Sequence, residues 1–577
     1  MCVDVSTINR SHMLKIALSF AIGALIINSV AISRDFQDSW ILEGLEVTFA
    51  LFVITYVVTF FSEKKISKMI ALAVIGRFVF LLIPNLKYAW FQGIWIDQHS
   101  QYAMANHVCN EGFIAPPGPF NFSVYSTTPL IHLIFAIFSI IPSIQLVYSI
   151  KYLLVLLSPI YPLLTYTIVK RLKVPWGTTG LKYALFVSSV PTGAYFIVSG
   201  TLFGSLLVFL TLSSLITSMH ENDRRYRFVF IFFVCALAAF HSSSSVLLSI
   251  FLLATYLLQK ASFYRLKPYV KTSVVLTTIS ISAAWLMFSA GTTLRKIAGT
   301  FFSGASGEPT PGSEQVPVRF FELARVNVVE AMKTVLPYYG GDIFVLLMSF
   351  AGLLVLLRMR KQLNDVSKFL TVLFGVASSS IPILLLLRVG GFRTLGFARL
   401  LFPIFSAIFI LSLSKRRAWM RAVILVPMIL LGTLQFYKCQ PLIPSANVLF
   451  PGLPANEPIV YVNLVNSVYQ RQMINFAKDH ATGHFALDLV TGNQIVGLTD
   501  LDFVLEHIGW VIYYPLGKND SERKYDCFLI HLPGISGGLY ERTEMRTRHV
   551  ILEAIYDSSI TYTNGESYIL TYNFTQR

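Results

Sequence analysis

Residues 66–112 read ISKMIALAVIGRFVFLLIPNLKYAWFQGIWIDQHSQYAMANHVCNEG. The first part, residues 66–83, is an apolar run long enough to cross a bilayer core, which needs about 20 residues of helix. An aromatic-rich stretch follows, and then Asp97 stands before a segment that is predicted to form a short amphipathic helix over residues 98–110. The stretch therefore predicts a membrane-spanning helix that leads into a long loop carrying a surface helix.

The composition of the whole chain agrees with a membrane protein. Of its 577 residues 54% are hydrophobic and only 13% are charged, whereas a soluble globular chain carries about 25% charged residues. The 46 Lys and Arg residues outnumber the 30 Asp and Glu residues, but the cations lie in short clusters between apolar runs. That distribution is typical of loops that set membrane orientation. A basic nucleic-acid-binding protein is therefore much the weaker interpretation, and we expect no nucleic acid as a partner.

The length criterion predicts about thirteen membrane-spanning helices in the chain. They lie near residues 14–32, 45–61, 66–83, 146–169, 179–198, 200–219, 227–241, 242–259, 269–289, 341–358, 368–388, 396–414 and 420–436. Between residues 1 and 436 the chain is thus predicted to be an all-α polytopic membrane domain. The segments 84–145 and 290–340 are too long for simple turns, and long loops in a compact bundle usually carry function.

The positive charges indicate how the spans are oriented, because cytoplasmic loops carry an excess of Lys and Arg. All the cationic turns fall on one side if Thr128–Pro142 is not a span, and we predict that this short, proline-bounded segment lies in or dips into the outer interface. The cationic turns are Lys64/Lys65/Lys68, Lys170/Arg171/Lys173, Arg224/Arg225/Arg227, Lys260/Arg265/Lys267/Lys271, Arg358/Arg360/Lys361/Lys368 and Lys415/Arg416/Arg417/Arg421. We therefore expect an integral protein of the plasma membrane, with its N-terminus in the cytoplasm and loops 84–145 and 290–340 outside.

The segment 437–577 is predicted to be a soluble extracytoplasmic α/β domain. Strand-like runs alternate in it with helical patterns, and its last part contains Asn564-Gly565, a strong signal for a tight β-hairpin turn. The strand-like runs are Ile459–Val462, Phe485–Val490, Trp510–Tyr514 and Cys527–Leu532. No glycine-rich phosphate-binding loop stands before a helix in this segment, so it is not predicted to bind nucleotides.

Asp97 is the first candidate for chemistry. A carboxylate at the membrane surface, beside a medium of low dielectric constant, can act as a general base or bind a divalent cation. It can equally do no more than cap the N-terminus of the helix that follows it, because Asp is common at that position. Sequence spacing alone favours the cap.

Three arginines form the second candidate. Arg388, Arg393 and Arg399 lie on the predicted outer side of two late spans, where membrane orientation gives no reason for a cluster of cations. The guanidinium group suits phosphate because its planar fork binds two phosphate oxygens while remaining charged. The alternative, for any one of the three, is that the side chain extends to lipid headgroups.

Two other polar positions lie among the predicted spans. Arg77 is a cation inside the span near 66–83, and an intramembrane cation indicates function unless it only pairs with a neighbouring helix. His241 and the serines 242–245 are predicted to form a polar outer turn.

The loop after the third span resembles the first outer loop of the GT-C superfamily of membrane glycosyltransferases, which includes protein O-mannosyltransferases, aminoarabinose transferases and oligosaccharyltransferases. In these enzymes an acidic residue follows a spanning helix and precedes a surface helix that ends in glycine. The residues that carry the resemblance are Asp97, Tyr102, Ala103, Val108, Gly112, Tyr125 and Pro129. Two further similar segments are the Lys170-Arg-Leu-Lys run and the late stretch Arg393-TLGFARLLFP.

The resemblance implies transfer of a sugar from a polyprenyl-phosphate-linked donor to a glycan, lipid or protein acceptor at the outer membrane face. Asp97 would be the catalytic base, and Arg393 with Arg399 or Arg388 would bind the lipid phosphate. The expected substrate-binding residues also include His99, Tyr102 and Tyr125. Many relatives have a second acid next to the first, but this chain has Gln98, so a divalent cation (Mg²⁺ or Mn²⁺) bound at Asp97 stays an open expectation.

Two other classes of function compete with this interpretation. A transporter or flippase of lipid-linked saccharides would place polar groups at the bilayer midplane in broken helices, often within inverted repeats. Here the charges crowd one rim, and the sequence shows no such repeat. A structural envelope protein would leave Asp97 and the outer arginines unrelated in space. We therefore expect a membrane glycosyltransferase.

Overall fold

The protein was analysed as a computed structural model. It describes residues 10–33, 39–86, 97–114, 128–172, 177–190, 200–221, 223–261, 270–289, 328–359, 362–386, 397–414, 424–431, 476, 485–488, 508–512, 527–531, 558–563 and 567–572. The chain divides into two compact units, the first made of residues 1–89, 151–314 and 335–439, and the second of residues 90–150, 315–334 and 440–577.

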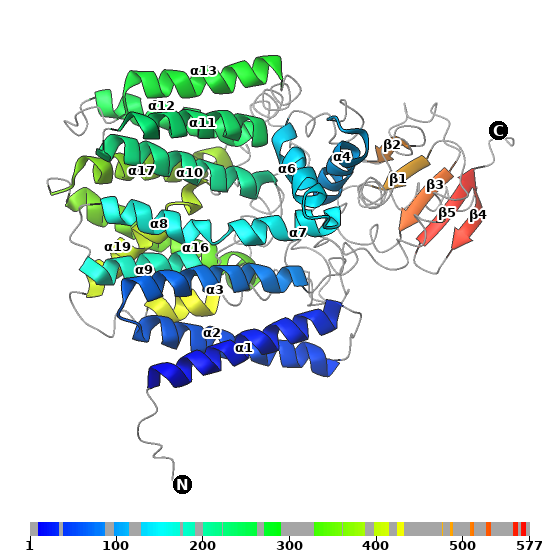
Figure 1. The fold of residues 1–577 in the computed structure, drawn as a ribbon, viewed down its shortest axis with the longest axis horizontal. Helices are drawn as coiled ribbons and strands as arrows, with labels where there is room; N and C mark the ends of the chain where they lie inside the picture. Colours follow the sequence, from blue (N-terminus) through cyan, green and yellow to red (C-terminus); the bar gives the residue numbers. More distant parts are fainter. Residues whose placement is uncertain are drawn as a thin grey trace, which may run out of the picture. The chain divides into compact units, whose positions relative to one another are not determined.

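The first unit is helical (Figure 1). Its described helices are α1 (Arg10–Ser33), α2 (Ser39–Ser62), α3 (Ile66–Leu86), α8 (Ile160–Arg171), α9 (Gly177–Ser189), α10 (Gly200–Glu221), α11 (Arg224–Phe240), α12 (Ser242–Lys260), α13 (Thr272–Phe288), α17 (Asp365–Leu386) and α19 (Phe402–Ser414). Two more, α7 (Leu146–Leu157) and α16 (Val328–Arg358), run across the division. Within the unit α10 packs on α11, α12 on α13, and α9 on α19.

The described helices agree with the expectation of a polytopic membrane protein. Six segments of the described residues are long and apolar enough to cross a membrane: Met13–Ala31, Glu43–Ser62, Ile66–Ile83, Tyr148–Arg171, Phe203–Glu221 and Ser242–Lys260. Four shorter apolar helices accompany them: Pro129–Ile140, Thr272–Phe288, Ile343–Arg358 and Phe402–Leu413. The total of about thirteen spans stays a prediction.

Helix boundaries differ from the sequence prediction at three places. The span predicted at 146–169 is two helices, α7 and α8, separated at Ser158-Pro159, because proline removes a backbone donor and restricts the residue before it. Helix α16 begins at Val328, inside the segment 290–340 that was predicted to be a loop. The span predicted at 396–414 is interrupted at residues 400 and 401, before α19.

An aromatic cluster fixes α3 within the first unit. The rings of Phe52, Tyr56 and Phe80 lie within 6.0 Å of one another, centroid to centroid. The Tyr56 hydroxyl donates a hydrogen bond to Ser189 Oγ on α9 at 2.6 Å. A Cβ atom at Gly76 would come within 2.5 Å of the Tyr56 ring. Glycine at this position therefore allows α3 to approach α2 closely, and it sets the orientation of α3 at the next residue, Arg77.

In its described residues the second unit has the helices α4 and α6 and a β-sheet, besides the ends of α7 and α16. Helix α4 (Asp97–Glu111) matches the surface helix predicted over residues 98–110, and it ends at Gly112 with a φ of 76°. Glycine is the residue best suited to this left-handed conformation after a helix. Helix α6 (Pro129–Ile140) packs against α4. It buries Ile131, His132, Phe135 and Ala136, whereas Ile137, Ile140 and Ile141 are exposed.

The described strands of the second unit form one sheet with the order β2-β1-β3-β5-β4. They are β1 (Phe485–Asp488), β2 (Ile508–Ile512), β3 (Cys527–His531), β4 (Ser558–Thr563) and β5 (Ser567–Tyr572). Strand β1 is parallel to β2 and β3, while β4 and β5 form an antiparallel pair. Three of the strand-like runs and the hairpin coincide with these strands. Residues 459–462, the turn at 564–566 and the helical patterns lie outside the described residues, so the α/β character of the domain stays a prediction.

Candidate functional site

The predicted catalytic residue, Asp97, is the first residue of α4. His99 and Tyr102 lie on the same helix. Tyr102 is half-buried, and its burial raises the pKa of its hydroxyl. The side chains of Asp97 and His99 are outside the described residues. The position of Asp97 at the start of the helix fits both a general base and a helix cap. Its role as the base stays a prediction.

Of the other predicted site residues, only Arg399 lies in the described part of the chain; Arg388, Arg393 and Tyr125 lie outside it. Arg399 is half-buried and ends a short helical turn, residues 397–399, that precedes α19. The turn is closed by two hydrogen bonds of the tighter i to i+3 kind. Leu400 N–H donates to the carbonyl of Phe397 at 3.2 Å, and Leu401 N–H donates to the carbonyl of Ala398 at 3.0 Å.

Proline explains why the helix is interrupted here. In a regular helix the carbonyl of Arg399 would accept from the backbone N–H of residue 403, but residue 403 is proline and has no N–H. The N–H of Ile404 bonds to the carbonyl of Leu401 at 3.0 Å and not to that of Leu400. Two consecutive carbonyls, those of Arg399 and Leu400, therefore need another donor.

Tyr161, near the start of α8, supplies this donor. Its hydroxyl donates to the carbonyl of Arg399 at 2.9 Å and lies 3.3 Å from that of Leu400. On the face of the Tyr161 ring lies the guanidinium of Arg77, 5.1 Å from the ring centroid. Arg77 is only 4% exposed, although it is the intramembrane cation of α3. The structure thus links Arg77, Tyr161 and the Arg399 turn.

Sequence reasoning singled out Arg77 and Arg399 separately but missed Tyr161. The available signal was Pro403, which stands four residues after Arg399. Because proline has no N–H, it predicts that the carbonyl of Arg399 lacks its usual helical donor. Nothing local to residue 161 indicates which carbonyl its hydroxyl reaches, because the two partners are 238 positions apart in the chain.

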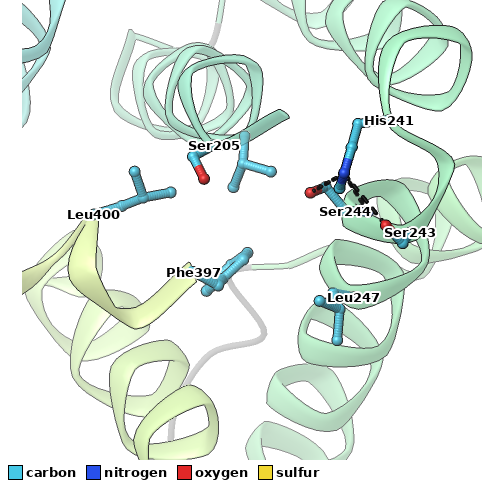
Figure 2. A pocket seen from close by; sticks show the side chains of 8 residues that line it. Ser205, His241, Ser243, Ser244, Leu247, Phe397 and Leu400 are labelled. Atoms are coloured by element: carbon cyan, nitrogen blue, oxygen red, sulfur yellow. Dashed lines mark hydrogen bonds between the residues drawn. The ribbon is translucent and has the colours of Figure 1, made fainter. Parts of the chain in front are cut away.

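A small pocket borders the other side of the same turn. Figure 2 shows Phe397 and Leu400 facing His241 and the serines that follow it, with Ser205 of α10 beside them. The cavity measures about 10 Å³, which is room for about one water molecule. The polar outer turn predicted at His241 is therefore packed against the Arg399 turn.

The orientation of the His241 ring is fixed by the start of α12. His241 Nδ1 accepts from the backbone N–H of Ser244 at 3.3 Å and lies 2.7 Å from Ser244 Oγ. Since Nδ1 is an acceptor, a neutral ring carries its proton on Nε2. A Cβ atom at Gly204 would come within 2.9 Å of the His241 side chain, so glycine permits α10 to pack against this residue. The described contacts make His241 a helix cap.

Metal ligands are not grouped in the described part of the chain: no three His, Cys, Asp or Glu residues there are placed to share an ion. The side chain of Asp97, the one residue predicted to bind a cation, lies outside the described part of the chain. A divalent cation thus stays an expectation of the sequence alone.

Comparisons with known proteins concern the fold of the chain. No protein-family profile matches the chain, and no curated protein matches its sequence. Its structure is similar to that of the Archaeoglobus fulgidus oligosaccharyltransferase solved with Zn and sulfate, at a TM-score of 0.50 and 11% identity, over 87% of this chain and 72% of that one. The fold is that of an oligosaccharyltransferase.

A second solved structure gives the same result. It is the archaeal oligosaccharyltransferase AglB from Archaeoglobus fulgidus, in complex with an inhibitory peptide and a dolichol-phosphate. The similarity has a TM-score of 0.51 at 10% identity, and it covers 88% of this chain and 74% of that one. The resemblance to the GT-C superfamily predicted from the Asp97 loop is therefore confirmed at the level of the fold. At this identity the likeness concerns the fold and not the substrate.

Proposed function

We propose that the protein is a membrane glycosyltransferase that moves a sugar from a polyprenyl-phosphate-linked donor to an acceptor. The observation that carries the proposal is an oligosaccharyltransferase fold in which Arg399, a predicted phosphate ligand, ends a helical turn held by Tyr161. A donor of this kind has its lipid in the bilayer and its reacting carbon at the surface. The reaction therefore belongs at the outer interface, beside loops 84–145 and 290–340.

The proposed reaction is a displacement at the anomeric carbon. The Asp97 carboxylate takes the proton from the acceptor hydroxyl or amide, and the freed electron pair forms the new bond to that carbon. The bond between the carbon and the phosphate oxygen breaks, and its electron pair leaves with the lipid phosphate. Arg393, with Arg399 or Arg388, binds the anionic leaving group. His99, Tyr102 and Tyr125 are proposed to contact the substrate.

The partners follow from this reaction. The donor is a membrane lipid, and the acceptor is a glycan, a lipid or a protein. The archaeal neighbour was solved with an inhibitory peptide and a dolichol-phosphate, which supports a polyprenyl phosphate as the first ligand to test and a peptide as the first acceptor. In the proposed topology residues 437–577 form an extracytoplasmic domain of the plasma membrane protein, where they can meet the acceptor.

A divalent cation, Mg²⁺ or Mn²⁺, is kept as a proposal at Asp97. The neighbour solved with Zn is consistent with a metal in that fold, but Gln98 stands where many relatives have a second acid. When bound, the cation would offset the negative charge of the donor phosphate. No proton transfer in the proposed reaction requires it.

The test is Asp97→Asn. Asparagine has nearly the shape of aspartate and still caps a helix, so the variant should fold and insert normally. If Asp97 is the base, transfer from a polyprenyl-phosphate-linked sugar falls by about 10²-fold or more. Transfer is measured with purified protein in lipid, with EDTA and with added Mn²⁺ or Mg²⁺ as separate arms.

Near-normal turnover by Asp97→Asn would reduce Asp97 to a helix cap. Transport of an intact lipid-linked saccharide without transfer by the unaltered protein would favour the flippase instead. The matched control is Asp365→Asn, since Asp365 is the first residue of α17 and has no proposed role in the reaction. It should retain full transfer.

A further inference from the structure

The Arg399 turn, the hydroxyl of Tyr161 and the buried cation of Arg77 meet at one place in the first unit. We propose that Tyr161, supported by Arg77, is a positioning residue that holds the break before α19 and thereby fixes the direction in which Arg399 is presented to an anionic ligand. The identity of that ligand as the phosphate of the donor lipid rests on the proposed function. The role of Tyr161 in holding the break does not rest on the proposed function.

The break needs a donor from outside its own helix. Pro403 leaves the carbonyl of Arg399 without its regular partner, and the i to i+3 bond of Ile404 leaves that of Leu400 in the same position. In apolar surroundings a backbone carbonyl without a hydrogen bond costs several kcal/mol of folding free energy. One hydroxyl, that of Tyr161, reaches both carbonyls at 2.9 and 3.3 Å.

Without this hydroxyl, the chain has two ways to fill the carbonyls. Water can enter the break, or residues 397–401 can rotate toward another donor. Either change alters the backbone at Arg399 itself, because the carbonyl concerned belongs to that residue. The direction of the Arg399 side chain is therefore coupled to the Tyr161 hydroxyl by a single residue's backbone.

Tyr161 is itself held on two sides. Its ring lies 5.0 Å from that of Phe209 on α10, centroid to centroid. On the ring face lies Arg77, in a contact that is stronger in desolvated surroundings than at an exposed site. The residue before Arg77 is Gly76, where α3 packs closely against Tyr56 of α2. The position of the Tyr161 hydroxyl therefore depends on contacts from α3 and α10 as well as on α8 itself.

The segments on either side of the break are anchored independently of Tyr161. The Phe397 ring packs 4.6 Å from that of Phe251 on α12. After the break, the Phe374 ring on α17 stacks on that of Phe405, 4.1 Å apart. Ser349 Oγ on α16, which donates to the carbonyl of Val345 at 2.7 Å, lies 3.2 Å from the carbonyl of Phe402. Because both neighbours are fixed, the residues between them are the part that a lost hydroxyl can move. This makes the role of Tyr161 local to Arg399.

The first experiment compares Tyr161→Phe with Tyr256→Phe. Both remove one hydrogen-bonded hydroxyl from the first unit; that of Tyr256 on α12 is exposed and lies 2.8 Å from Thr272 Oγ1 on α13. We expect Tyr161→Phe to weaken binding of a polyprenyl phosphate by about three- to tenfold, the scale of one lost hydrogen bond. Tyr256→Phe should bind like the unaltered protein. Equal binding by all three proteins overturns the proposal.

The second experiment does not depend on the donor. In a protein with its native cysteines replaced, Arg399→Cys provides a thiol whose reaction rate with a soluble thiosulfonate reports the exposure of position 399. Adding Tyr161→Phe should change this rate severalfold, and adding Tyr256→Phe should not. An unchanged rate overturns the positioning role. If the unaltered protein binds no polyprenyl phosphate but the rate changes as expected, the proposed function fails and the positioning role stands.

Pro403→Ala separates positioning from stability. Alanine restores the N–H that a regular helix offers to the Arg399 carbonyl, so the variant should fold at least as stably as the unaltered protein. Because the break is then lost, we expect polyprenyl-phosphate binding to fall, alone and in combination with Tyr161→Phe. Recovery of both thermal stability and binding in the double variant would show that Tyr161 only satisfies the backbone, and it would overturn the proposal. This variant also serves if Tyr161→Phe alone does not fold.

Discussion

The two ends of α8 are held by different kinds of interaction. At the Tyr161 end, a hydroxyl donates to the main-chain carbonyl of Arg399 and lies 3.3 Å from that of Leu400, beside a buried arginine. At the Arg171 end, Arg171 forms a salt bridge with Glu221 at 2.9 Å, and the side chain of Asn364 donates to the carbonyl of Arg171 at 3.2 Å. The glutamate side chain there is 41% exposed.

The difference lies in what replaces a lost interaction. Around the Tyr161 end Tyr161 and Leu400 are buried and Arg399 is half-buried, so a removed donor leaves carbonyls that water reaches only by entering the break. Around the Arg171 end the Glu221 side chain meets solvent while that of Arg171 is 17% exposed, and water replaces the lost carboxylate at little cost. We therefore infer that perturbations near the break in α19 change the fold or the site, while perturbations at the Arg171 end change stability only slightly.

The largest effect is expected from Gly352→Ala, close to the break. A Cβ atom at Gly352 on α16 would overlap the carbonyl oxygen of Phe405 on α19, which is backbone and cannot rotate away. Separating the two helices should lower the free energy of unfolding by about 1–3 kcal/mol, the range for overpacking. Thermal unfolding in detergent measures the change.

Gly375→Ala is the matched control for this substitution. Gly375 lies in α17, and nothing lies within 4 Å of the Cβ atom that alanine would add. Alanine is preferred over glycine in a helix by about 0.5–1 kcal/mol, so this variant should unfold at the same temperature or slightly above. Equal losses from both alanines would refute the close approach of α16 to α19.

Elements were easier to predict from the sequence than their interruptions. The apolar runs at α2, α3 and α12 have the length that a bilayer requires, and they predicted helices within a few residues of the observed bounds. The hairpin strands β4 and β5 followed from alternation around Asn564-Gly565. The start of α16 did not follow: the apolar run predicted a span from residue 341, whereas the helix begins at Val328.

The candidate site was predictable only in its separate parts. Asp97 and Gly112 mark the two ends of α4 through local chemistry, a helix start and a left-handed glycine, and both are visible in the sequence. Arg399 was visible as a cation out of place. The contact between Tyr161 and the Arg399 carbonyl depends on how α8 packs beside α19, and no local pattern encodes such a distant pairing.

A smaller effect is expected from Asn364→Ala at the Arg171 end. Asn364 Oδ1 accepts from the backbone N–H of Ser367 at 3.0 Å, and Nδ2 bonds to Arg171. Loss of this cap should lower the free energy of unfolding by about 1 kcal/mol, without any change in polyprenyl-phosphate binding. Asn364→Asp keeps the acceptor for Ser367 but not the donor to Arg171, so it should recover most of the loss. A binding defect in either variant would contradict the proposed separation of the two ends.

The smallest effect is expected from Glu221→Gln. The substitution removes one charge of the Arg171 salt bridge and keeps a side chain that can still accept a hydrogen bond from Arg171. A pair whose carboxylate is exposed in this way contributes about 0–1 kcal/mol, so we expect a decrease in unfolding temperature near the limit of measurement. Because salt screens exposed charges over about 10 Å at 0.1 M, the difference from the unaltered protein should disappear in 1 M NaCl. A loss that persists in high salt would mean that the pair is shielded from solvent, and the contrast between the two ends of α8 would then no longer rest on exposure.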